Sequence, residues 1–146
     1  TKPQAATGMT QLAKIDRVIK LRLNRFQQLH GLLADVTEIL RPAGIEEGHG
    51  CHLYVARLNT DKVSFTRPDF LKHLKETWQV ACGNHYPAVW SWEAFEKVAY
   101  DNSNTPVTHQ AVQQVMSLPL FSSTSEEDVE YIAHAINETI AALKKG

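Results

Sequence analysis

Apolar residues recur at helical spacing through the first part of the chain, from about Thr7 to Val36. The stripe consists of Leu12, Ile15, Ile19, Leu23, Phe26, Leu29 and Leu33. No proline interrupts it, so the pattern predicts a single long helix of roughly eight turns at ~3.6 residues per turn. The opposite face is basic and carries Lys14, Arg17, Lys20, Arg22 and Arg25. Such a face is typical of a solvated helix surface, and an anion-binding face or a contact between subunits are the alternatives.

Three later segments have the composition of β-strands. They are His52–Leu58, Gln79–Tyr86 and Val115–Leu118. Pro87 follows the second segment and Pro119 follows the third. Because proline has no N–H to donate to a ladder, each of these two strands is expected to end there.

The remaining segments carry helix-start signals. Pro68 suits a first helical position and predicts a helix over residues 69–78. Ser91 is predicted to cap a short helix through Ala99, and Thr105-Pro106 is predicted to start another after a polar loop at 101–104. A capping box at Thr124-Ser125-Glu126-Glu127 opens a last helix with its own apolar stripe. The order of elements predicts an α+β fold, with a small three-stranded, mainly antiparallel sheet backed by helices and preceded by the long N-terminal helix.

The composition argues against several classes of binding partner and location. The chain has 146 residues and a formal net charge of −1, which gives no electrostatic case for nucleic acid or an anionic membrane as partner. No apolar run approaches the ~20 residues that a membrane-spanning helix needs, and no charged-then-apolar leader opens the sequence. Two cysteines cannot build a disulfide framework, so a reducing, cytoplasmic location is expected.

Cysteine and histidine pairs suggest two kinds of site. His49-x-Cys51-His52 and Cys82-x-x-His85 contain zinc-type ligands near predicted strand ends, but neither pair has the usual zinc spacing. A nucleophilic Cys82 or Cys51 would need an electropositive, accessible setting, and the sequence shows none. Cys82 follows Val80-Ala81 and has the pattern of a small buried hydrophobe. No metal site and no catalytic residue is therefore predicted.

The segment Gly83-Asn84-His85-Tyr86-Pro87 is the candidate ligand-binding site. It presents an imidazole and a phenol at the end of a predicted strand. A regular strand points His85 and Tyr86 to opposite faces, so one of the two is expected to face a given pocket. A purely structural, hydrogen-bonding role for His85 is the alternative. Trp90 and Trp92 are predicted to pack, and His52 to be structural. The sequence reveals no partner for His30, His73, His109 and His134 on the predicted helices.

Six stretches in order carry a family resemblance. They are Gln4-Ala5-Ala6-x-Gly8-x-x-Gln11-Leu12-x-Lys14-x-Asp16, His52-Leu53-Tyr54-Val55, Arg67 before a helix with Leu71 and Leu74, His85-Tyr86-Pro87, Ser117-Leu118-Pro119, and the Glu-Glu-x-Val-x-Tyr-Ile helix from Glu126. Together they resemble the C-terminal part of the DegT/StrS-type sugar aminotransferases. These are pyridoxal phosphate (PLP) enzymes of the aspartate aminotransferase fold. The resemblance covers nearly the whole chain.

The resemblance implies that the cofactor-binding residues lie in a different domain from the one formed by this chain. In such enzymes the cofactor-binding lysine and the acidic partner of the pyridine nitrogen lie in a large upstream domain. An asparagine-arginine pair that reaches the partner subunit's cofactor phosphate would also fall before Thr1. Residues 1–40 would then form a linking helix and residues 41–146 the small C-terminal domain, with the large PLP-binding domain absent from this chain. No cofactor-binding residue is expected here, and PLP is implied for the intact enzyme.

The resemblance also implies site residues and partners. His85 matches a histidine that borders the substrate end of the active site, and Tyr86 matches the adjacent substrate-side position, with a mainly structural role. The Trp90-Ser91-Trp92 segment departs from the family's usual continuation, so no substrate preference carries over. A small-molecule sugar substrate and a homodimer are implied for the intact enzyme.

Two functional hypotheses follow. In the first, the chain is the C-terminal domain of an aminotransferase that moves an amino group from glutamate or glutamine to a nucleotide-linked keto-sugar, and it is inactive alone. In the second, it is a stand-alone binding or self-association module, because apolar surface that no large domain covers needs a partner.

Overall fold

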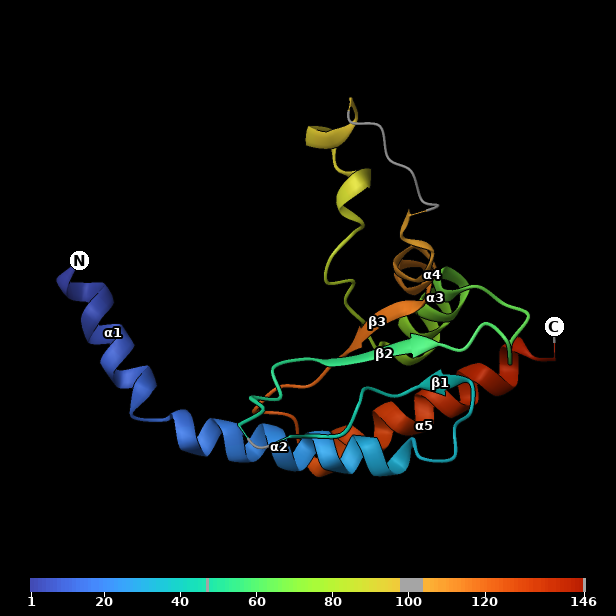
Figure 1. Ribbon diagram of the computed structural model, residues 1–146. Coiled ribbons are helices and arrows are strands. Elements are labelled where there is room, and N and C mark those ends of the chain that lie inside the picture. The colour runs from blue at the N-terminus through green and yellow to red at the C-terminus, as the bar shows by residue number, and fades with distance from the viewer. Residues whose placement is uncertain (47, 98–103, 146) are drawn as a thin grey trace.

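A computed structural model describes residues 1–46, 48–97 and 104–145 of the chain. In chain order the elements are the helices α1 (Lys2–Leu12) and α2 (Ile15–Leu32), the strands β1 (Ile39–Leu40) and β2 (Tyr54–Leu58), the helix α3 (Arg67–Trp78), the single 3₁₀ turns η1 (Val89–Ser91) and η2 (Glu93–Phe95), the helix α4 (Pro106–Gln114), the strand β3 (Val115–Leu118) and the helix α5 (Glu126–Leu143). Figure 1 shows a short sheet lying against helices, with α1 and the loop that carries η1 and η2 projecting from the body.

The sheet has three antiparallel strands with β2 in the centre. Tyr54 of β2 pairs with Leu118 of β3, and Leu58 of β2 pairs with Ile39 of β1. Tyr54 and Leu58 are fully buried, whereas Val55 is exposed. This alternation is the consequence of side chains pointing to opposite faces of a strand, so one face of the sheet is fully covered and the other is only partly covered, by α4 (Pro106–Gln114). The α+β class and the antiparallel three-stranded sheet are confirmed.

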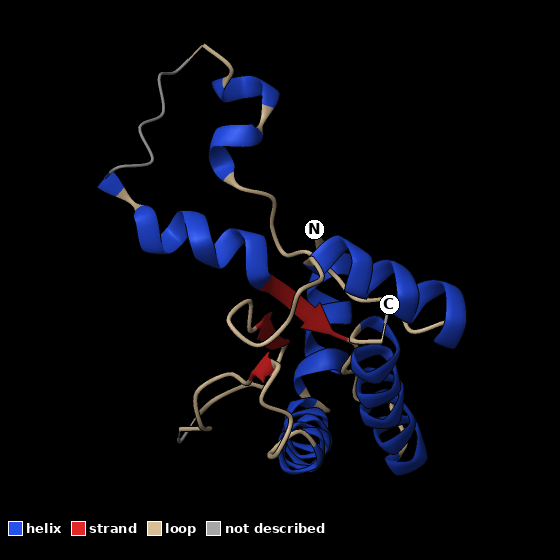
Figure 2. Ribbon diagram, turned by 90° about the vertical axis from the view of Figure 1, so that its right-hand side faces the viewer, coloured by secondary structure: helices blue, strands red, loops and turns tan. Residues whose placement is uncertain are grey.

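Helices α2 and α5 run side by side against the covered face, and α3 packs against α5 (Figure 1). The stripe expected on α5 is buried as predicted; it consists of Val129, Ile132, Ala133, Ile136 and Ile140. Phe26 and Leu29 of α2 complete the same core. Helix α4 runs directly into β3, as Figure 2 shows, so β3 enters the sheet from a helix that lies beyond its edge.

The prediction of a strand at Gln79–Tyr86 is wrong. Gln79 ends α3 in a left-handed conformation, with a φ of 55°, and only Gly83 of the segment pairs with β3. Two main-chain hydrogen bonds of 2.9 and 2.8 Å join Gly83 to Ser117. The third strand is β1 instead. Its two residues are too few to show a strand pattern in the sequence, and they pair because the turn after α2 carries them beside β2.

The prediction of a single long N-terminal helix is also wrong. The helix is broken at Ala13 and Lys14 into α1 and α2. Both residues are good helix formers, so the sequence gives no signal for the break. None of the α1 residues is buried, whereas α2 buries Phe26 and Leu29. Only the second helix is therefore held in place by packing against the domain.

The remaining helix predictions are mostly confirmed. Helix α3 begins after Thr66, whose hydroxyl accepts a hydrogen bond from the Asp69 N–H, and α4 begins at Pro106. The last helix is confirmed, but its capping box is formed by Ser125 and Asp128, one residue later than predicted.

The helix expected after Ser91 is wrong within the described residues. The two single turns η1 and η2 replace it, and the Ser91 hydroxyl donates to the Ala88 carbonyl instead of capping a helix. The end of that predicted helix and most of the predicted 101–104 loop lie outside the described residues.

Candidate functional site

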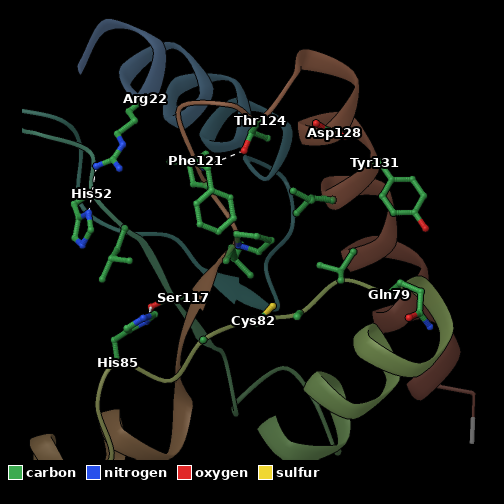
Figure 3. Close-up of a pocket in the computed structure, with 18 residues that line it drawn as sticks. Arg22, His52, Gln79, Cys82, His85, Ser117, Phe121, Thr124, Asp128 and Tyr131 are labelled. Carbon is green, nitrogen blue, oxygen red and sulfur yellow. Dashed lines mark hydrogen bonds between the residues drawn. The ribbon is translucent and has the colours of Figure 1, made fainter. Parts of the chain in front are cut away.

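A groove of about 850 Å³ opens beside the exposed edge of β3 (Figure 3). Its walls come from four separate parts of the sequence. They are Arg22 of α2, residues 52–53, residues 79–83 with His85, and the continuous stretch from the end of β3 to the start of α5. A volume of this size suits a small-molecule ligand.

One end of the groove is formed by His85 and Ser117 (Figure 3). The Nδ1 of His85 lies 3.0 Å from the Oγ of Ser117, which is buried in β3. Gly83 lies beneath the imidazole, where a Cβ would come within 2.8 Å of the same Nδ1. A glycine and a serine thus position the ring. No described residue is hydrogen-bonded to the Nε2 of His85, which leaves that nitrogen available to a ligand.

Tyr86 lies apart from this groove. Its side chain is 75% exposed, and it is not among the residues that line the cavity. Its ring meets that of His85 edge-on, with centroids 6.1 Å apart. The structure therefore places His85 in the groove wall and Tyr86 outside it, and a substrate contact by either residue stays a prediction.

A second end of the groove is formed by Arg22 and His52, two residues that the sequence did not connect (Figure 3). The Arg22 Nη1 lies 3.2 Å from the His52 Nδ1. The Nε of Arg22 is buried and has no hydrogen-bond partner among the described residues. Phe121, which is 60% exposed, adds an apolar surface next to this pair.

The other polar side chains discussed for the groove are either hydrogen-bonded within the protein or protonated and unreactive. The Asp128 carboxylate accepts a hydrogen bond from the Ser125 N–H and caps α5, and these bonds to Ser125 lower the pKa of Asp128. Burial raises the pKa of the Cys82 thiol to about 11. The Tyr131 hydroxyl donates to the main-chain oxygen of Trp78. None of these groups is placed as a nucleophile or as half of an acid–base pair.

The cysteine and histidine motifs considered as metal ligands do not form one cluster. His49 Nδ1 lies 3.3 Å from the Sγ of Cys51, whereas His52, Cys82 and His85 line the groove. Within residues 1–46, 48–97 and 104–145 no group of three or more His, Cys, Asp or Glu side chains is placed to hold a metal ion. Burial raises the pKa of the Cys51 thiol, with the Arg22 charge acting in the opposite direction.

Each helix histidine left without a role by the sequence has a partner in the fold. His30 Nδ1 lies 3.3 Å from the Tyr54 hydroxyl, and His73 Nδ1 lies 3.2 Å from Thr139 Oγ1. Two others make ring contacts: His109 stacks on Trp90 and His134 meets Trp78 edge-on. Most of these pairs join residues far apart in the chain, so no local sequence pattern marks them. Trp90 packs against His109 through this stacking contact. The side chain of Trp92 is 42% exposed.

Within the described residues, no helix is both long enough and apolar enough to cross a membrane.

Comparison with known sequences gives a family match. Residues 1–137 match the model of the DegT/DnrJ/EryC1/StrS aminotransferase family. A spore coat polysaccharide biosynthesis protein, SpsC of Bacillus subtilis, is 27% identical over 94% of this chain. The match covers 36% of that protein's length.

Solved structures share the fold. A sugar aminotransferase of Streptococcus pneumoniae in its PLP form superposes on 98% of this chain with a TM-score of 0.85 at 20% identity, and 36% of its own chain is covered. PseC of Helicobacter pylori, an aminotransferase of pseudoaminic acid biosynthesis, superposes on 95% of this chain with a TM-score of 0.80 at 18% identity, and 37% of its chain is covered. The chain thus spans about a third of the length of the relatives that it matches.

Proposed function

This chain belongs to the DegT/DnrJ/EryC1/StrS aminotransferase family, and from that membership we propose that it forms the small-domain part of a PLP-dependent sugar aminotransferase. In the proposed reaction an amino group passes from glutamate or glutamine to a keto-sugar linked to a nucleotide. In this proposal the chain forms one wall of the substrate-binding cleft. The observation that carries the proposal is the groove containing His85, in a chain that matches a family of aminotransferases over residues 1–137.

His85 suits a sugar contact because its ring is fixed while one nitrogen stays available. The bond to Ser117 occupies Nδ1, so Nε2 is left to act as a donor or an acceptor according to the tautomer. A sugar hydroxyl can complement either role. The exposed ring of Phe121 offers an apolar surface in the same groove, and ligand pockets commonly combine such surfaces with a few placed polar groups.

The groove residues do not fit PLP. The cofactor needs a lysine to carry it and an acidic group for its ring nitrogen. In the described part of the chain no lysine lines the groove, and the one carboxylate that does, Asp128, is bound to Ser125. We therefore assign no chemical step to this chain, and its residues bind and orient the substrate only. The chain alone is expected to transfer no amino group.

A second candidate function is self-association. Four apolar side chains along α1 and the first turns of α2 are at least 36% exposed; they are Met9, Leu12, Ile15 and Ile19. An exposed apolar row of this kind favours a covering surface, which a second copy of the chain would supply. A concentration-independent monomer mass in light scattering would rule this function out.

Titration of the isotope-labelled chain with a nucleotide-linked keto-sugar, followed by NMR, tests the main proposal. We expect saturable shifts at His85 and Ser117 and binding weakened by about two- to tenfold in His85→Ala, the loss expected when an exposed side chain gives up one hydrogen bond to a ligand. The matched control is Asn84→Ala, which removes an exposed neighbour that does not line the groove. Equal binding by both variants would overturn the assignment of His85.

A further inference from the structure

The Arg22 end of the groove carries a positive charge that no described carboxylate balances. The ion pairs of the described residues are Arg25 with Glu126 and Lys144 with Glu38, and Arg22 takes part in neither. Among the described residues, Asp128 is the only acidic side chain that lines the groove, and it is held by Ser125. A charged group in a cavity is ordinarily paired, so an unpaired guanidinium there points to a partner that arrives with a ligand.

The hydrogen bond between Arg22 and His52 sets which atoms face the ligand. A guanidinium can only donate, so the His52 Nδ1 must accept from Arg22 Nη1 at 3.2 Å. In this tautomer the proton of the imidazole is on Nε2, which becomes a second donor beside the guanidinium. The Arg22 Nε also has no acceptor among the described residues, but it is buried. The donors that a ligand in the groove can reach are therefore the remaining guanidinium N–H groups and the imidazole of His52, which is exposed.

We propose that Arg22 and His52 form an anion subsite that binds a phosphoryl group. The planar fork of a guanidinium matches phosphate oxygens in a bidentate manner, and an imidazole N–H supplies a further donor. The basic face of α2 leads to this point, because Arg22 is the member of that face whose side chain turns into the groove (Figure 3). The remaining basic residues of the stripe serve the solvated surface or, for Arg25, an ion pair.

The subsite adds a second binding contact to the proposed function. The identity of the molecule that carries the phosphoryl group rests on that proposed function. His85 and Arg22 line the same groove but come from different walls of it. A ligand with a sugar at His85 and a phosphoryl group at Arg22 is a sugar phosphate, and the nucleotide-linked keto-sugar of the proposed function is one member of that class. The anion subsite itself follows from Arg22 and His52 alone.

Inorganic pyrophosphate is the probe, because it contains the phosphoryl groups without the sugar. The labelled chain is titrated at constant ionic strength while the Arg22 Nε–H signal is followed by NMR. We expect saturable shifts centred on Arg22 and His52. Arg22→Gln is expected to weaken binding by about tenfold or more, since bonds to a charged group exceed the ~1.4 kcal/mol that a tenfold change represents.

Arg17→Gln is the matched control. It removes the same charge from the same helix, at an exposed position outside the groove, and is expected to change binding less than about twofold. Arg22→Lys, which keeps the charge and loses the fork, should bind more weakly than the unaltered chain and more tightly than Arg22→Gln. Amide spectra of each variant establish that it is folded.

Equal affinities in Arg22→Gln and Arg17→Gln, or shifts that never saturate, would overturn the subsite. Such a result would leave the His85 proposal standing, because pyrophosphate contains no sugar. Conversely, loss of the keto-sugar response at His85 with pyrophosphate binding retained would overturn the proposed function and leave the subsite in place.

Discussion

The imidazole of His85 lies directly against Gly83, so that a Cβ at position 83 would be 2.8 Å from its Nδ1 and closer still to its Cε1. The same Nδ1 is bonded to Ser117, the residue that pairs with Gly83 across the edge of β3. The position of the ring therefore depends on the absence of a side chain at one residue and on a hydroxyl at the other.

Gly83→Ala should displace the His85 ring. The clash is with a side chain that can rotate, so we expect the Ser117 bond to be lost while the fold is retained. The measurement is the NMR shift of the His85 ring, together with keto-sugar binding, which should weaken as in His85→Ala. Gly31→Ala is the control, because a Cβ there meets nothing within 4 Å on α2. That change should stabilise the chain by about 0.5–1 kcal/mol without moving His85. An unmoved ring in Gly83→Ala would contradict the account.

Arg67→Ala should destabilise the chain. Its Nη1 donates to the main-chain oxygens of Val112 and Val115, at 3.1 and 2.7 Å, where α4 ends and β3 begins. Bonds to a charged group contribute about 1.5–3 kcal/mol, so chemical denaturation should show a loss of that order. The control Lys72→Ala changes an exposed residue of α3 and should cost less than about 0.5 kcal/mol. A loss no larger than that of the control would mean that Arg67 does not hold this junction.

Neither cysteine should react readily in the folded chain. Burial raises the pKa of Cys82 to about 11 and also raises that of Cys51, so both thiols stay protonated at neutral pH, and the thiolate is the reactive form. With a disulfide reagent at pH 7.5 we expect little reaction before denaturant is added and two thiols per chain afterwards. A rapid reaction of one thiol in the native state would show that one of the two is activated.

Stability should fall as the solution is acidified through the ordinary range of histidine. Burial, with the Arg41 charge second, lowers the pKa of His30 below its usual 6.5. The unfolded chain then takes up this proton more readily than the folded one, so stability is lost as pH falls below about 6.5. Thermal melts from pH 8 to pH 5 should show this decline. His30→Gln should reduce the decline, and an identical pH slope in that variant would assign it to other groups.

The elements with strong local signals could be read from the sequence. Helix α5 combines a capping residue, an acidic first turn and an apolar stripe, and α3 is capped by Thr66 and has a proline in its first turn. These signals are set within a few residues, so they survive folding unchanged. The break between α1 and α2 has no such signal, because Ala13 and Lys14 at the break are both good helix formers. What distinguishes the two helices is packing, since α1 buries none of its residues.

The edges of the sheet and half of the groove could not be predicted. Strand β1 has two residues, and Gly83 joins β3 through a single bridge. Both pairings depend on where the chain returns in space. The bond between Arg22 and His52 spans thirty positions in sequence, so the basic stripe of α2 indicated an anion site as one alternative without showing which arginine faces a cavity. The sequence could propose His85 because its motif is contiguous, and the structure places that residue in the groove wall, while its contact with a substrate stays a prediction.

The central claim is that the groove wall bearing His85 serves an aminotransferase whose chemistry resides outside this chain. Its most direct test is amino transfer from glutamate by a hybrid in which residues 1–137 replace the matching part of the Bacillus subtilis relative. The account predicts that the hybrid transfers amino groups and that the chain alone does not. His85→Ala should slow the hybrid by about tenfold or more, as expected for lost substrate positioning, while Asn84→Ala changes little. A folded His85→Ala hybrid with an undiminished rate, or turnover by the chain alone, would contradict it.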